Sequence, residues 1–125
     1  RLSSLIERKE LEDLQEELSD RFGPPPPEAR NLLGLMSIRI LLKGLRIGRL
    51  DVGRDGVALS FEEDENRDPE GLVRMAQEDP GRFTFLSGNK IKIRTGRLTL
   101  PEDLRKIENR IEDLGKWVRR TTRTN

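Results

Sequence analysis

The chain has 125 residues, of which 38% are charged and 33% are hydrophobic, and its net charge is +1. It has no cysteine and no histidine, which excludes disulfides, thiolate metal sites and the side chain best suited to proton transfer near neutral pH. The length favours one domain, and no run of about 18 apolar residues predicts a membrane span, so we expect a cytoplasmic protein.

The first predicted element is a helix over residues 4–22. Its apolar residues recur at three- and four-residue spacing, which is typical of one buried stripe. That stripe consists of Leu11, Leu14 and Leu18. Gly23 can adopt the left-handed conformation that ends a helix. We therefore expect residues 1–23 to form the first helical segment.

The end of this helix carries a group of charged residues. Glu17, Asp20 and Arg21 fall on or beside one polar face, because residues three and four apart are neighbours on a helix. The prolines at 24–27 form a stiff spacer that fixes the direction in which the chain leaves. This pattern favours a surface that another protein binds. The alternative is a solvated helix end with weak internal pairing, worth about 0.3–0.5 kcal/mol.

The second predicted helix covers residues 28–43 and is the most apolar part of the chain. Gly44 is expected to end it. Its apolar residues form two flanking stripes, so we expect a central helix that is contacted on two sides. The first stripe is Ala29, Leu32, Leu33, Met36 and Ile40, and the second is Leu35, Ile38 and Leu42.

Two β-hairpins are predicted in the following segment. Asp55-Gly56 lies between two β-prone runs, which is a strong hairpin signal. Ser87-Gly88-Asn89 marks a second turn of the same kind. The four expected strands cover residues 47–52, 57–61, 83–86 and 90–94.

Helices are predicted between and after the hairpins. A short helix begins with Asp68 as N-cap and Pro69 at its first position. The last helix covers residues 101–120, and we expect residues 121–125 to fray. Trp117 is expected to cover the edge of the domain's own core, although tryptophan is also common as an anchor at interfaces.

These elements predict an α+β domain. Two β-hairpins surround a short helix (ββ-α-ββ), and an N-terminal, a central and a C-terminal helix flank them. We interpret residues 1–125 as a single regulatory domain, in which residues 28–100 form the core. Since the sequence begins at Arg1 rather than at methionine, we expect a fragment of a longer protein.

No motif in the sequence predicts catalysis or a cofactor. Neither GxxxxGK[ST] nor GxGxxG occurs, so the chain has no visible means of holding ATP or a dinucleotide. The acids at 62–65 do not have the spacing of a calcium loop, and we interpret them as a solvated loop. No predicted pocket desolvates a pair of carboxylates. We therefore expect no catalytic residue, no cofactor and no metal.

Basic residues gather in the last third of the chain. Residues 1–80 carry 12 basic and 18 acidic side chains, whereas residues 81–125 carry 12 and 5. Lys90, Lys92 and Arg94 alternate along one strand and so share a face, which Arg97 extends. A nucleic-acid contact is one hypothesis for this face. No aromatic residue lies between these basic residues to stack on bases, so the alternative is the polar outer face of a half-buried strand.

The run from Leu11 to Gly23, followed by the prolines, resembles the signature of the C-terminal (TRCF) domain of bacterial transcription-repair coupling factors. The similarity covers most of residues 10–118. The run of four prolines and the basic, tryptophan-containing tail depart from the usual family pattern. Further similar segments are residues 28–33, 45–47, 56–61, 68–69, 79–80 and 82–83.

The resemblance implies a regulatory domain of an ATP-driven DNA translocase that removes stalled RNA polymerase and recruits excision repair. Such a domain contains no ATP site, and DNA is bound by the parent motor. It docks on a UvrB-like module of the same protein and covers the surface that UvrA binds until polymerase is engaged. The family's acid and Asp-Arg pair at the docking face correspond here to Glu17, Asp20 and Arg21.

Overall fold

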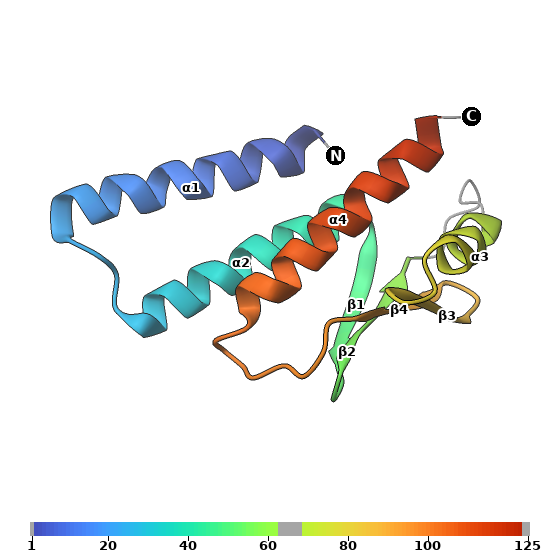
Figure 1. Ribbon diagram of the computed structural model, residues 1–125. Helices are drawn as coiled ribbons and strands as arrows, with labels where there is room; N and C mark the ends of the chain where they lie inside the picture. The colour runs from blue at the N-terminus through green and yellow to red at the C-terminus, as the bar shows by residue number, and fades with distance from the viewer. Residues whose placement is uncertain (1, 63–68, 124–125) are drawn as a thin grey trace.

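The computed structural model describes residues 2–62 and 69–123 of the chain (Figure 1). It confirms the α+β class and the ββ-α-ββ order that the sequence predicts. The elements are α1 (Leu2–Phe22), α2 (Pro27–Gly44), β1 (Ile47–Val52), β2 (Gly56–Phe61), α3 (Pro69–Glu78), β3 (Phe83–Ser87), β4 (Lys90–Arg94) and α4 (Leu104–Arg123).

The two hairpins join into a single four-stranded antiparallel sheet with the order β1-β2-β4-β3. The central strands β2 and β4 pair in a regular register, in which Leu59 lies opposite Ile91. Both edge strands contain an irregularity instead. The register of β1 shifts between Ile47 and Arg49, and that of β3 shifts between Phe85 and Ser87.

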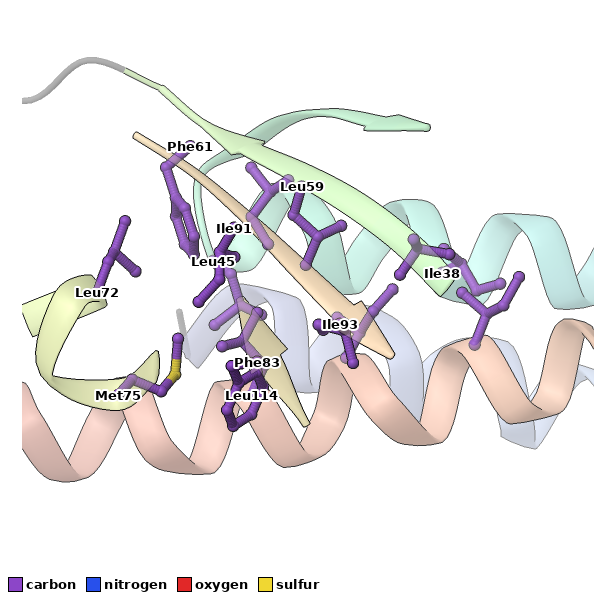
Figure 2. Packing of buried hydrophobic residues seen from close by; sticks show 14 residues of the cluster. Ile38, Leu45, Leu59, Phe61, Leu72, Met75, Phe83, Ile91, Ile93 and Leu114 are labelled. Carbon is purple, nitrogen blue, oxygen red and sulfur yellow. The ribbon is translucent and has the colours of Figure 1, made fainter. Parts of the chain in front are cut away.

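One face of the sheet packs against α2 and α4, and this contact forms the hydrophobic core. Alternate residues of each central strand point into it, because successive side chains of a strand face opposite sides. Leu72 and Met75 of α3 close one end of the core (Figure 2). The fully buried side chains of this sheet core are Val57, Leu59, Phe61, Met75, Ile91, Ile93, Ile107, Ile111 and Leu114.

Helix α1 lies outside this core. It packs on α2, on the side away from the sheet (Figure 1). Leu11 is buried, as predicted, but Leu14 and Leu18 are 48% and 42% exposed. The three leucines share one side of the helix, as their spacing predicts, but of the three Leu11 alone is buried. Arg8, in the same half of α1 as Leu11, binds Glu108 of α4, whereas Leu14 and Leu18 lie in the half that is exposed.

Helix α2 is central, as its apolar composition predicts. It contacts α1, α4 and β1. Its remaining side faces solvent, since Leu32, Leu35 and Met36 are exposed. The two predicted stripes are therefore only partly buried. Three elements surround the helix and cover the rest of its surface.

The ends of the helices follow local rules, with some differences from the prediction. Helix α2 ends at Gly44, but the residue in the left-handed region is Arg46, with φ of 61°. Helix α4 begins at Leu104, after a turn in which the Asp103 carboxylate accepts a hydrogen bond from the Thr99 N–H at 2.7 Å. It continues through Arg123, into the segment that was expected to fray.

Two further sequence expectations concern the chain around the last strands. Trp117 is partly buried and packs against the core, which confirms that it covers the core's edge. The predicted N-cap Asp68 lies outside the described residues, as does most of the acidic run at 62–65. Across the described residues, no helix is long and apolar enough to cross a membrane.

Candidate protein-binding surface at the end of helix α1

The structure places the three predicted site residues on the exposed last turns of α1. The Arg21 guanidinium lies 3.3 Å from the Glu17 carboxylate, and both side chains are mostly exposed. Asp20 is exposed and makes no ion pair with another described residue. The helix thus brings Glu17 and Arg21 together and leaves Asp20 beside them with its carboxylate open to a partner.

Local chemistry fixes the direction of this helix end. Gly23 has φ of +82°, and its N–H donates to the Ser19 carbonyl at 2.8 Å. A left-handed glycine that closes a helix in this way is a common C-terminal cap. The following prolines have restricted φ angles, and Pro27 already begins α2. The chain therefore leaves the charged end through one glycine followed by stiff prolines.

An exposed apolar ridge lies beside these charges, and the sequence analysis missed it. It consists of Leu14, Leu18 and Phe22, which are four residues apart along α1, and Phe22 is 79% exposed. Because exposed aromatic residues often anchor protein interfaces, Phe22 adds an apolar contact to a surface predicted to be polar. The signal in the sequence was the four-residue spacing of Leu14, Leu18 and Phe22, whereas Leu11 and Leu14 are three residues apart.

The charged side chains of this surface lie open to solvent. Its carboxylates are solvated and lack the desolvating cleft that perturbs catalytic acids. Exposed charges at the rim of an interface provide specificity and tunable affinity instead. Among residues 2–62 and 69–123, no cluster of three or more Asp, Glu, His or Cys side chains could hold a metal ion.

A partly buried polar cluster, which the sequence analysis also missed, attaches the other half of α1. Arg8 Nη2 lies 2.5 Å from Glu108 Oε2 and 3.4 Å from Glu112 Oε1 of α4. Ser37 Oγ of α2 donates to the same Glu108 oxygen at 2.5 Å. No local pattern could have predicted this cluster, because Arg8 and Glu108 are 100 residues apart.

The electrostatics of the cluster favour the charged state of its arginine. Burial lowers the pKa of Arg8, but hydrogen bonds and Coulombic attraction from Glu108 and Glu112 outweigh it, so the pKa is raised above its ordinary value. Arg8, Ser37 and Glu108 also line a groove of about 710 Å³ between α1, α2 and the start of α4. The prolines at 25 and 27 line this groove as well.

The second predicted site, on β4, has the expected alternation of buried and exposed side chains, but its positive charge is weaker than the sequence predicts. Ile91 and Ile93 are fully buried, whereas Lys90 and Arg94 are exposed on the opposite face. Lys92 shares that outer face, but its Nζ lies 2.9 Å from the Asp55 carboxylate. Its charge is thus largely offset by Asp55.

The surroundings of this outer face do not supply a stacking platform. In the register of the sheet, Lys92 lies opposite Ala58 and Thr84, and the phenylalanines of the sheet pack into or against the core instead. Arg97 is exposed after the end of β4. The face therefore offers some positive charge but no described aromatic side chain for bases.

The fold and the surface together define a small α+β domain with a charged, exposed helix end. The model of the TRCF domain family matches residues 1–72 of the chain. The chain is 32% identical over 123 residues to the transcription-repair-coupling factor of Escherichia coli, and 31% identical over 104 residues to that of Haemophilus influenzae. These alignments cover 98% and 74% of this chain. The chain therefore belongs to the TRCF domain family.

The comparisons also locate the chain within much longer relatives. The alignments cover only 10% of the E. coli protein and 9% of the H. influenzae protein. The fold is shared with a solved C-terminal domain of a transcription-repair coupling factor, at a TM-score of 0.62 and 19% identity. That match covers 88% of this chain and 71% of the solved chain.

Proposed function

We propose that this chain is the C-terminal docking domain of a transcription-repair coupling factor. In this proposal the end of α1 binds a UvrB-like module of the same polypeptide and covers the surface that UvrA binds. The observation that carries it is the exposed group of Glu17, Asp20 and Arg21 on a rigidly ended helix. Membership of the TRCF domain family supports the parent context.

A restraint of this kind has to release, and the composition of the surface suits that requirement. Contacts within a chain that open during function are smaller and more polar than permanent interfaces. Engagement of RNA polymerase then acts by shifting the population toward the open state. The shift is limited by the polymerase's preference for that state.

We propose no catalytic role for the domain itself. The parent protein acts as an ATP-driven DNA translocase in the cytoplasm, and its motor region binds ATP and DNA. The absence of both nucleotide-binding motifs from this sequence supports that division of labour. UvrA and RNA polymerase are therefore indirect partners of this domain.

A second candidate function is a nucleic-acid contact through Lys90, Lys92, Arg94 and Arg97. It is favoured by the shared outer face of the three residues on β4, two of which make no ion pair with a described carboxylate. It predicts retention on DNA that weakens steeply as salt is raised. If the chain elutes at low salt from a DNA column in the same volume as from a column without DNA, this function is excluded.

The docking proposal is tested by calorimetric titration of this chain against the separately produced UvrB-like module. We expect 1:1 binding that weakens as salt screens the charged contacts. Asp20→Arg should weaken binding about tenfold or more, because it places a like charge opposite the partner's basic residue. In the intact parent protein the same change should increase UvrA binding and ATPase activity.

The control is Asp13→Arg, which makes the same change of charge on the same helix. Among the described residues, Asp13 pairs with Lys9 in an exposed contact at 3.3 Å, so its reversal should leave module binding nearly unchanged. Equal weakening by both substitutions would indicate a general effect of net charge. Unchanged binding with Asp20→Arg would contradict docking through this surface.

A further inference from the structure

From Ile6 to Phe22, the part of α1 whose side chains the structure describes, helix α1 contributes no residue to the sheet core. The cluster of buried hydrophobic residues begins at Ile38 in α2 and ends at Leu114 in α4. Leu11 is the buried hydrophobic residue among the described side chains of α1, and it lies outside that cluster. The apolar ridge of the helix faces solvent. Burial of apolar surface therefore holds α2, α4 and the sheet together but holds α1 only weakly.

Among the described residues, the polar cluster of Arg8, Ser37, Glu108 and Glu112 also holds α1. It joins three helices, since Arg8 is in α1, Ser37 in α2 and both acids in α4. The side chains of Arg8 and Glu108 are only 17% and 11% exposed. By contrast, the neighbouring pair of Lys9 and Asp13 is well exposed and lies within α1.

We propose that this cluster is a latch, and that α1 opens from α2 and α4 as a unit while the sheet core stays folded. A buried ion pair is sensitive to the loss of one partner, because the other is left as an uncompensated buried charge. Loss of this cluster therefore removes the described polar contacts that join α1 to α4 and leaves its packing on α2. The latch residues Arg8, Ser37 and Glu108 also line the groove between α1, α2 and the start of α4, so contact between these elements is incomplete there.

The connection to α2 permits this movement. Gly23 is the residue between α1 and the prolines, and no atom lies within 4 Å of the position of an added Cβ. Hinges are a few residues at element ends that absorb changes in φ and ψ. The stiff prolines lie between Gly23 and α2, so they keep the pivot in place relative to α2. Release of the latch thus swings α1 about Gly23 rather than unwinding it.

The latch also affects the docking surface. This step rests on the proposed function. Glu17, Asp20 and Arg21 lie on the helix that the latch positions. A released α1 presents them in a different orientation relative to the rest of the domain. The latch thereby sets whether the docking surface matches its partner.

The first test is native-state hydrogen exchange on the unmodified chain at low denaturant concentrations. We expect the amides of α1 to exchange through an opening that is more frequent and less denaturant-dependent than the opening that exposes β2 and β4. A single shared opening for α1 and the central strands would overturn the proposal. This measurement needs no variant, so it does not depend on how a substitution folds.

The second test removes the charge of the latch while keeping most of the side chain's bulk. Arg8→Met should accelerate exchange in α1 about 100-fold and leave β2 and β4 nearly unchanged. Lys9→Met is the matched control, and its exposed pair should alter exchange by less than about threefold. The double variant Arg8→Met, Glu108→Met should recover most of the protection, because both buried charges are then gone.

Three results would overturn the latch. They are no acceleration with Arg8→Met, equal acceleration in β2 and β4, and no recovery in the double variant. Hydrogen exchange reports on α1 whether or not the UvrB-like module binds. Failure of the docking proposal therefore shows in the titration, whereas failure of the latch shows in the exchange.

Discussion

Helix α1 and the layer formed by the sheet with α2 and α4 are held by different forces. In the layer, side chains such as Leu59, Ile93 and Ile111 have no exposed surface. Helix α1 is attached through Leu11 and a cluster of buried charges. Hydrophobic burial is non-directional and tolerant of small shifts, whereas a buried ion pair depends on geometry. A chain with few hydrophobic residues thus concentrates them in one layer and attaches its first helix by polar contacts.

The largest expected effect is the difference in stability when the same leucine-to-alanine substitution is made in the sheet core and in α1. Leu59→Ala in the sheet core should lower the free energy of unfolding by about 3 kcal/mol, because it leaves a cavity in a closed site. Leu14→Ala on the half-exposed ridge of α1 should change it by less than about 0.5 kcal/mol. Urea denaturation measures both. Similar losses for the two variants would mean that α1 belongs to the core.

A smaller effect is expected at the start of β2. A Cβ at Gly56 would lie 2.3 Å from the Ile93 carbonyl oxygen of β4, so Gly56→Ala must push the two central strands apart. We expect a loss of about 1–3 kcal/mol. Gly53→Ala, in the same turn, is the control, because its nearest neighbour is at an ordinary 3.5 Å. Thermal unfolding of both variants checks this, and equal melting temperatures would contradict it.

Phe22→Ala should barely alter stability, because this side chain is mostly exposed at the end of α1. We expect a change below about 0.5 kcal/mol in urea denaturation. If the docking proposal holds, the same variant should weaken binding of the UvrB-like module about tenfold, through loss of an apolar anchor. A large loss of stability would instead place Phe22 in the fold's own packing.

The smallest effect concerns acid stability at the first hairpin. A hydrogen bond and Coulombic attraction from Lys92 lower the pKa of Asp55 below its ordinary value of 3.8. The pair therefore stabilises the fold fully above pH 3.8, and this contribution is lost as pH falls through the lower, folded-state pKa. The difference in melting temperature between the unmodified chain and Asp55→Asn should be small and should shrink in acid. Lys92→Met should remove the same pH dependence, and an unchanged acid profile in either variant would contradict the assignment.

The sequence predicts those parts of this fold that depend on residues close together along the chain. The bounds of β4 match the prediction, because Ile91 and Ile93 alternate with charged residues between turn signals. The pairing of β2 with β4 is not encoded locally. Two hairpins with similar apolar faces can associate in more than one order, and the helices that cover them select one.

The candidate site was predictable to a similar extent. Glu17, Asp20 and Arg21 are polar at a helix end, and their exposure follows from that position. The exposure of the second half of α1 did not follow, because the spacing of Leu11, Leu14 and Leu18 places all three on one side of the helix. The contact of Arg8 with Glu108 attaches the first half of α1 and joins residues 100 apart in sequence. Leu14, Leu18 and Phe22 lie beyond that contact, on the half of the helix that is left exposed.

The irregular registers of β1 and β3 have a consequence for how this domain behaves at high concentration. An open sheet has unpaired N–H and C=O groups along its outer strands, which can add a strand from another copy. Here each outer strand has one irregularity in its pairing, between Ile47 and Arg49 in β1 and between Phe85 and Ser87 in β3. Such irregularities disturb the edge that a neighbouring molecule would have to extend. The outer strands of this sheet thus discourage ordered aggregation through their own pairing.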